Sequence, residues 1–236
     1  MQPFNGALDN ITSSFTTNRN GLSTEQAYHI LEKEQGRIEW SPRYDGVSEL
    51  LYTILSQHTS DLNSLKAFQS LRDKFWPWER ITQAKTEDIA KAIWMGGLSK
   101  VKAPRIKRVL QDIQDKCGVL DLSFLKRMPM DKAKEWLQEL PGVGPKTAAV
   151  VLCFAMGMPA MPVDTHIYRV TKRLGFISPK DTPEQAHSRL EASIRPEHVF
   201  AFHMYLITHG RQVCKARRPL CQQCVLSVGC PSGFQI

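Results

Sequence analysis

The sequence lacks the signals of a membrane or exported protein. Its longest apolar stretch, Ala148–Met156, is too short to cross a bilayer, which takes about 20 residues. The N-terminal stretch is polar and lacks the basic-then-apolar order of a secretory signal peptide. We therefore expect an intracellular protein with no membrane partner, and we interpret residues 1–22 as a flexible lead-in.

Strand signals are nearly absent too, as are internal repeats and low-complexity tracts. Ser23 and Gln26 form a capping box that begins the first predicted helix, which ends near Gly36. Apolar residues then recur at helical spacing, as in the stripe Val47, Leu50, Leu51, Ile54 and Leu55. The fold class is therefore all-α. One further helix, capped by Asp61, is predicted to carry Leu65, Phe68 and Leu71. Others are predicted over 86–93, 103–116, 131–140, 145–156, 182–194 and 197–208, and from Asp164 onward.

Cysteine is sparse and unevenly placed. In an intracellular protein the six cysteines are more often metal ligands or core thiols than disulfides. Cys117 and Cys153 stand alone, and we interpret them as apolar core residues. Four thiolates near the C-terminus suit either a [4Fe–4S] cluster or a tetrahedral zinc ion, and the spacing rules leave both open. These four are Cys214, Cys221, Cys224 and Cys230.

Positive charge is in excess. Lys and Arg number 31 against 23 Asp and Glu, which gives a formal net charge of +8. This balance favours a polyanionic partner such as nucleic acid. The rest of the composition is that of an ordinary globular protein, and 236 residues suffice for one large domain or two small ones.

The stretch Leu140–Leu174 carries the most specific pattern. Gly142 and Gly144 flank Val143 in a tight turn, where glycine suits positive φ angles and lets a phosphate approach the backbone. Pro145 follows at the first helical position, where its missing N–H costs nothing. The amides of this turn form a candidate anion site, although a plain helix-to-helix turn is the alternative for Gly-x-Gly alone.

Lys146 and Asp164 can be brought together within this stretch. A helix over Pro145–Met156 is roughly 18 Å long, and the proline-containing return from Gly157 can extend about 23 Å. Asp164 would then cap the next helix beside Lys146. The positive end of a helix favours a neutral amine, so Lys146 could attack a sugar carbon. Asp164 could take its proton or stabilise an oxocarbenium-like sugar; a surface lysine and an ordinary capping aspartate are the alternative.

These residues resemble the helix–hairpin–helix–Gly/Pro–Asp motif of the DNA glycosylase superfamily. The runs LPGVGPKTAAVVL and VDTHIYRV are most similar to the endonuclease III branch, and the resemblance extends from about residue 23 to 232. In that family the lysine after the hairpin is the Schiff-base nucleophile, and the aspartate before Thr-His is the second catalytic group. By position these are Lys146 and Asp164, and the hairpin residues Gly142, Val143 and Gly144 are expected to contact DNA.

The resemblance implies two helical lobes with a DNA cleft between them. One is a six-helix domain over residues 39–158 that holds the hairpin, and the other joins 23–38 to 159–236. Endonuclease III has an inserting glutamine at the position of His58 and an intercalating leucine at the position of Leu98. Such tip residues would fill the gap left by a flipped base. The change to His58 leaves the recognised base open, and a helix-end histidine and simple packing of Leu98 are the alternatives.

The four C-terminal cysteines match the iron–sulfur loop of this family at every position. The resemblance therefore favours a [4Fe–4S] cluster over zinc, in a C-terminal cluster loop. Lys215, Arg217 and Arg218 lie inside the first cysteine loop, where a bound cluster would present them to phosphates. A second basic run either lines the phosphate backbone or forms a solvated helix face: Lys100, Lys102, Arg105, Lys107 and Arg108.

The expected function is that of a bifunctional DNA glycosylase with AP-lyase activity in base excision repair. It would act as a monomer, in the cytoplasm or nucleoid, on double-stranded DNA that contains a damaged, oxidised pyrimidine or an abasic site. A monofunctional mismatch glycosylase for uracil, thymine or adenine is the first alternative; the adenine branch has a catalytic glutamate at the position of Thr53 and lacks the hairpin lysine. A non-catalytic DNA-binding protein is the second.

Overall fold

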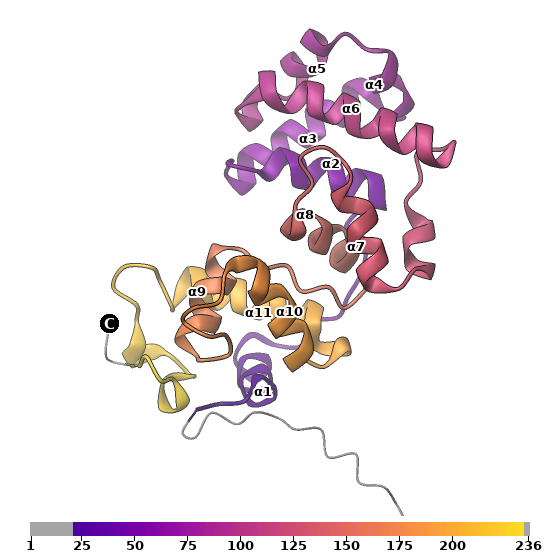
Figure 1. The fold of residues 1–236 in the computed structure, drawn as a ribbon. Helices are drawn as coiled ribbons and strands as arrows, with labels where there is room; N and C mark the ends of the chain where they lie inside the picture. Colours follow the sequence, from indigo (N-terminus) through magenta and orange to yellow (C-terminus); the bar gives the residue numbers. More distant parts are fainter. Residues whose placement is uncertain (1–20, 234–236) are drawn as a thin grey trace, which may run out of the picture.

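The computed structural model describes residues 21–233 (Figure 1), and most of the predicted lead-in over 1–22 lies outside them. Every regular element within residues 21–233 is helical and none is a strand, so the all-α prediction is confirmed. No helix in this part of the chain is long and apolar enough to cross a membrane. The α-helices are α1 Thr24–Gln35, α2 Gly46–Ser56, α3 Asp61–Phe75, α4 Glu79–Gln83, α5 Thr86–Ala92, α6 Ser99–Cys117, α7 Met130–Gln138, α8 Pro145–Val150, α9 Thr165–Arg173, α10 Pro183–Ser193 and α11 Val199–Gln212.

Shorter helical turns connect these helices. Five are 3-10 turns, namely η1 Trp94–Gly96, η2 Ser123–Arg127, η4 Pro196–His198, η5 Cys221–Gln223 and η6 Ser227–Gly229. The remaining one, η3 Val151–Ala155, is a π-helical continuation of α8.

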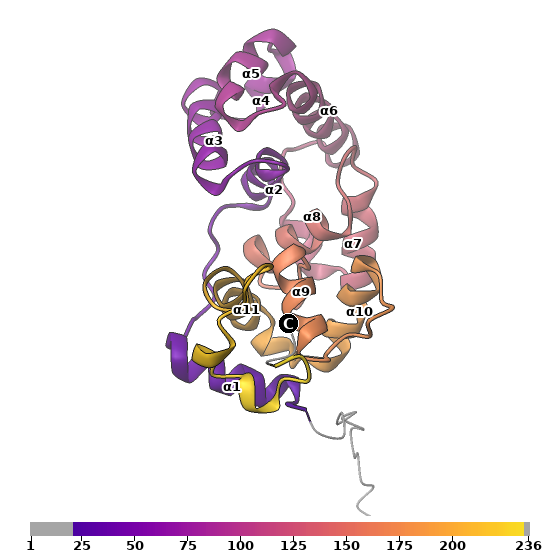
Figure 2. The same ribbon diagram turned by 90° about the vertical axis from the view of Figure 1, so that its left-hand side faces the viewer.

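The helices form two lobes, seen from two sides in Figures 1 and 2. The first lobe contains α2 to α8 around one hydrophobic core, and the second contains α1 with α9, α10, α11 and the C-terminal turns around another. The cores meet at η3, where Leu152 belongs to the first and Cys153 to the second. The hairpin helix α8 therefore ends between the two cores.

The first core is centred on α2. Its predicted stripe is confirmed, since Leu50, Leu51, Ile54 and Leu55 have no exposed surface. This face packs against α3, α6 and α8. Each such leucine stabilises the fold by about 1.5–3 kcal/mol relative to an exposed side chain, so α2 holds the first lobe together.

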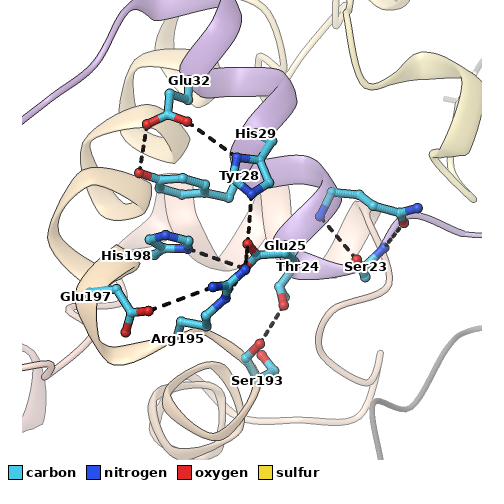
Figure 3. Close-up of polar contacts among 11 residues, drawn as sticks. Ser23, Thr24, Glu25, Tyr28, His29, Glu32, Ser193, Arg195, Glu197 and His198 are labelled. Atoms are coloured by element: carbon cyan, nitrogen blue, oxygen red, sulfur yellow. Dashed lines mark hydrogen bonds and ion pairs between the residues drawn. The ribbon is translucent and has the colours of Figure 1, made fainter.

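The second lobe is closed by contacts between α1 and the end of α10 with the segment that follows it (Figure 3). Thr24 Oγ1 donates to the carbonyl oxygen of Ser193 at 2.5 Å, and Glu25 pairs with both Arg195 and His198. Burial alone would raise the pKa of Glu25, but the hydrogen bond from Arg195 and the charge of His198 lower it. These contacts join the start of the chain to its last third.

Several predicted helix ends are confirmed by their caps. Ser23 and Gln26 form the predicted capping box of α1, and Gly36 ends that helix with a φ of +83°. Thr182 and Gln185 form a second capping box at the start of α10.

Other predicted ends are wrong. Ser60 rather than Asp61 caps α3, and α6 begins at Ser99 rather than 103 because Pro104 is accommodated inside the helix. Helix α11 continues through Gly210 because the glycine lets it approach α9: a Cβ there would lie 3.1 Å from Cβ of His166. Helix α4 was not predicted, since five residues are too few to show a helical period.

Candidate active site and DNA-contacting surface

The predicted hairpin is a tight turn between α7 and α8. The amide of Val143 donates to the carbonyl oxygen of Leu140 at 3.1 Å, and Gly142 has the positive φ, +77°, that favours glycine. Gly144 has a φ of −94° and a ψ of −179°, so the prediction of a positive φ on both sides of Val143 is wrong for this residue. Gly144 serves instead as the N-cap of α8.

The two glycines differ in their surroundings. A Cβ on Gly142 would lie 2.4 Å from Nε of Arg105, so Arg105 packs directly against this backbone. A Cβ on Gly144 would meet no atom within 4 Å, and no side chain caps α8 there. The backbone at Gly144 is thus open to close approach, and the first-turn amides of α8 have no side-chain partner.

Lys146 is the second residue of α8 and is exposed. The predicted helix over 145–156 extends nearly as far as expected, but its last five residues, Val151–Ala155, form a π-helical turn that the sequence pattern did not indicate. Single π-helical turns occur often near functional sites.

Asp164 caps α9, as predicted. Its carboxylate accepts a hydrogen bond from the amide of Ile167 at 2.8 Å, and the side chain is half-buried. This bond orients the carboxylate at the start of the helix.

The pKa of the buried side chain of His203, on α11, is affected by the charges of both Lys146 and Asp164. Burial lowers the pKa of His203 to about 4; the charge of Asp164 acts to raise it, and that of Lys146 to lower it. Both predicted catalytic side chains therefore lie within electrostatic range of one imidazole. Nδ1 of His203 lies 3.1 Å from the carbonyl oxygen of Pro162, which can only accept, so this nitrogen carries the proton. Sequence reasoning missed His203; its only signal was a histidine within an apolar helix.

Arg43, which is exposed and pairs with buried Glu49, also acts on His203. Nε of Arg43 donates to Oε2 of Glu49 at 3.0 Å, Glu49 has no exposed side-chain surface, and the charge of Arg43 helps to lower the pKa of His203. The Arg43 guanidinium lies 4.4 Å from the ring centroid of Tyr52. The signal in the sequence was a glutamate on the apolar face of a helix.

Thr53 lies one turn after Glu49. Its hydroxyl is buried and donates to the carbonyl oxygen of Glu49 at 2.8 Å. Thr53 therefore takes the position of the catalytic glutamate of the adenine branch. Its side chain bonds to the backbone of its own helix, α2.

The two predicted tip residues share an unusual backbone conformation. His58, between α2 and α3, has a φ of +54°, and Leu98, before α6, has a φ of +50°. Among the described residues the third non-glycine with positive φ is Arg218, which was predicted to contact phosphates. All three side chains are exposed. Non-glycine residues in this region store strain, and such residues cluster at ligand-binding sites.

Gln57 connects the loop of His58 to the hairpin. Its Nε2 donates to the carbonyl oxygen of Gly142 at 3.2 Å and to Thr147 Oγ1 at 3.3 Å. Nη1 of Arg105 donates to the Gln57 Oε1 at 2.9 Å. Gln57 and Arg105 thereby fix the turn next to Lys146. The sequence indicated Arg105 only as part of a basic run, and nothing in the pattern distinguished Gln57.

The four C-terminal cysteines line one small pocket. Its wall also contains Val170, Leu174 and Leu220. Burial is the main cause of the raised pKa of Cys224, to which the charges of the other three thiols add. Within residues 21–233 no group of three or more His, Cys, Asp or Glu is arranged so that it could hold a metal ion. The four sulfurs thus share a pocket and suit a metal centre by donor chemistry, without converging on one point.

The basic loop between the first two cysteines is held by α9. Arg173 Nη1 donates to the carbonyl oxygen of Lys215 at 2.8 Å, and Arg169 Nε donates to that of Cys214 at 3.1 Å. Lys215, Arg217 and Arg218 are exposed on this loop. The helix that Asp164 caps therefore also supports the predicted phosphate-contacting residues.

Comparison with known proteins agrees with this geometry. Residues 51–196 match the family described as "HhH-GPD superfamily base excision DNA repair protein". An endonuclease III of Sulfolobus acidocaldarius is 36% identical over 184 residues, which cover 77% of this chain and 79% of the relative. A relative from Arabidopsis thaliana, provisionally named as a DNA glycosylase, is 34% identical over 187 residues. The matched region covers 79% of this chain but only 60% of the plant protein.

A solved structure shows the same fold. A trapped covalent intermediate of endonuclease III with DNA superposes with a TM-score of 0.75 at 30% sequence identity. The superposition covers 91% of this chain and 98% of that chain. The similarity therefore includes both lobes.

Proposed function

This chain belongs to the HhH-GPD superfamily of base excision DNA repair proteins, and we propose that it is a bifunctional member that removes a base and then cleaves the strand. It is a DNA glycosylase of base excision repair, as its similarity to endonuclease III implies. The further proposal concerns lyase activity, the residues that carry it and the substrate, an oxidised pyrimidine in double-stranded DNA.

The observation that carries this proposal is the placement of a lysine and a carboxylate at two helix starts. Lys146 is exposed at the first turn of α8, and Asp164 is held at the start of α9 by the amide of Ile167. The charges of both also affect the pKa of buried His203. An amine nucleophile and a carboxylate are the two groups that lyase chemistry requires. Mere phosphate binding by the hairpin would need neither.

The reaction then follows from these two groups. Asp164 accepts a proton from the Lys146 ammonium, and the free amine attacks C1′ of the flipped nucleotide. The C1′–N bond to the base breaks, and the base leaves with a proton. The sugar ring opens to an imine on Lys146, and loss of a C2′ proton expels the 3′ phosphate by β-elimination. Water then releases the sugar fragment and restores the amine.

We further propose that Cys214, Cys221, Cys224 and Cys230 hold a [4Fe–4S] cluster, with zinc as the alternative. Four thiols that share one largely apolar pocket support this, because thiolates crowded together are stabilised by a bound metal centre. When bound, the cluster would fix the basic loop of Lys215, Arg217 and Arg218. Its role is structural.

DNA would contact the hairpin, the two tip residues and the basic loop. The open backbone at Gly144 supports the first, and the exposed left-handed residues His58, Leu98 and Arg218 support the others. One hairpin and one Lys146 suffice for one duplex, so we propose that the protein acts as a monomer, in the cytoplasm or nucleoid.

Borohydride trapping tests the lyase proposal. The protein is mixed with a duplex that contains one abasic site, and reduction converts any imine to a stable covalent bond. We expect an adduct with the wild type and with Lys33→Ala, which removes an exposed lysine of α1, and none with Lys146→Ala. Asp164→Asn should slow trapping by about 10²–10⁴-fold.

An adduct that persists in Lys146→Ala would overturn the assignment of the nucleophile. No adduct with any variant, together with release of a free base from a second duplex that carries an oxidised pyrimidine, would identify a monofunctional glycosylase instead.

A further inference from the structure

Lys102 is a buried cation that the proposed reaction does not use. It lies on α6 with 2% of its surface exposed, and the fully buried apolar residues Ala103 and Ile106 follow it in the same helix. The basic run that follows Leu98 was expected to line phosphates or face solvent, and Lys102 does neither. Within residues 21–233 its ammonium group bonds to carbonyl and hydroxyl oxygens and to no carboxylate. Burying a charge without a counter-ion costs free energy, so a lysine at this position lowers the stability of the fold.

The three hydrogen atoms of the Lys102 ammonium reach three different segments. Nζ donates to the carbonyl oxygen of Leu55 at 2.7 Å, to Thr59 Oγ1 at 2.7 Å and to the carbonyl oxygen of Gly96 at 2.8 Å. The Thr59 hydroxyl also donates to that oxygen of Gly96. Lys102 therefore joins the end of α2 to both loops that carry a tip residue.

The carbonyl of Leu55 explains how the charge is tolerated. It belongs to the last turn of α2, where carbonyl groups lack helical partners and the helix dipole is negative. Burial, and then the charge of Arg105, lower the pKa of Lys102 to about 8, so the ammonium form still predominates near neutral pH.

The atoms that Lys102 holds are next to the two strained residues. His58 directly precedes Thr59, and Leu98 lies two residues after Gly96. Their φ values, +54° and +50°, are costly for side chains of this size and persist only where the surroundings fix them. Leu98 has 56% of its surface exposed, so its own packing does not supply that restraint.

We propose that Lys102 is a positioning residue, whose ammonium group holds the two tip loops at a fixed separation so that His58 and Leu98 enter a duplex together. This inference rests on the proposed function, because it assumes that these loops fill the gap left by a flipped nucleotide. An apolar side chain would fill the same space without joining the loops.

The test uses a duplex in which a tetrahydrofuran analogue of an abasic site lies opposite 2-aminopurine. The tetrahydrofuran analogue cannot form an imine with a lysine. Insertion of the tip residues unstacks 2-aminopurine and raises its fluorescence, whereas binding itself is followed by anisotropy. Lys102→Met is compared with Lys100→Met, which removes the same charge from an exposed position on the same helix. We expect both variants to bind, and only Lys102→Met to lose most of the fluorescence rise at saturating protein.

A second arm measures strand cleavage at a natural abasic site in duplex and in single-stranded DNA. Lys102→Met should lose about ten- to a hundredfold on the duplex and little on the single strand, where no gap must be filled. Thr59→Val should act like Lys102→Met, and Thr59→Ser, which keeps the hydroxyl, should act like the wild type. The two Thr59 variants also test the inference if Lys102→Met does not fold.

A full fluorescence rise with folded Lys102→Met and Thr59→Val would overturn the inference. Equal losses on duplex and single strand would also overturn it, because they would indicate a purely structural role. If the wild type cleaves neither substrate yet raises the fluorescence, the lyase proposal fails and the positioning role stands.

Discussion

Arg211, in the last turn of α11, forms an ion pair with Asp61, in the first turn of α3, with 2.9 Å between Nη2 and Oδ2. This pair joins the second lobe to the first beside the loop of His58. A second pair, Lys134 with Glu191 at 2.5 Å, joins α7 to α10. The two pairs differ in exposure: 49% and 71% for Arg211 and Asp61, against 18% and 9% for Lys134 and Glu191.

Exposure predicts which pair holds the lobes together. Arg211→Ala should lower the free energy of unfolding by less than about 1 kcal/mol, because water and salt screen an exposed pair. Lys134→Met should cost about 3 kcal/mol, because it leaves the buried Glu191 without its cation. Urea unfolding of each variant at low and high salt measures both values. Equal costs, or a salt effect confined to Lys134, would contradict the prediction.

The hairpin glycines should respond differently to alanine. Gly142→Ala should lower stability by about 1–3 kcal/mol, because its φ is positive and the new Cβ would displace Arg105. Gly144→Ala should change stability by less than about 1 kcal/mol, because its φ is negative and the space beside it is open. The added methyl group should weaken DNA binding instead. Thermal unfolding and anisotropy on an abasic duplex separate the two effects, and equal loss of stability would contradict the assignment.

Buried His203 should make the fold acid-sensitive. Its pKa is about 4 in the folded protein against an ordinary 6.5, so the unfolded chain binds the proton more tightly. The stabilisation that follows is complete above pH 6.5 and is lost as the pH falls from 6.5 to 4, to an extent on the order of 3 kcal/mol. His187 and His209 also have lowered pKa values, so the contribution of His203 is the difference between wild type and His203→Gln. Parallel pH profiles would contradict it.

The cysteine pocket predicts a spectroscopic result. Protein purified without oxygen should be brown if a [4Fe–4S] cluster is bound and colourless if zinc is bound, and metal analysis should give iron or zinc accordingly. Cys221→Ser should lose the metal and the order of the basic loop, whereas Cys117→Ser, outside the pocket, should keep both. Retention of metal by Cys221→Ser would exclude this pocket as the site.

Much of the fold could be predicted because it depends on local signals. Capping boxes and the stripe on α2 act within one or two turns, and a sequence records them directly. The hairpin and the capping role of Asp164 could be predicted for the same reason, because glycine, proline and a capping carboxylate have local effects. The end of α11 was predicted wrongly because it depends on α9, which is distant in sequence.

The supporting residues of the site could not be predicted, because each acts across a long sequence separation. Lys102 looks like any lysine in a basic run until the carbonyl groups of Leu55 and Gly96 are placed beside it. Gln57 has no distinctive neighbours in the sequence, yet it bonds to a turn 85 residues away. His203 gave a weak signal, a polar ring in an apolar helix, that did not indicate which groups it faces.

The contact between Thr24 and Ser193 has a consequence for synthesis on the ribosome. The two residues are separated by 169 positions, so α1 has no partners when it leaves the exit tunnel. The first lobe, whose core lies between Val47 and Ala160, can collapse while translation continues. The second lobe must wait until α11 has emerged, and the amphipathic α1 remains exposed meanwhile. Nascent chains that stall before this point should therefore recruit chaperones through their first helix.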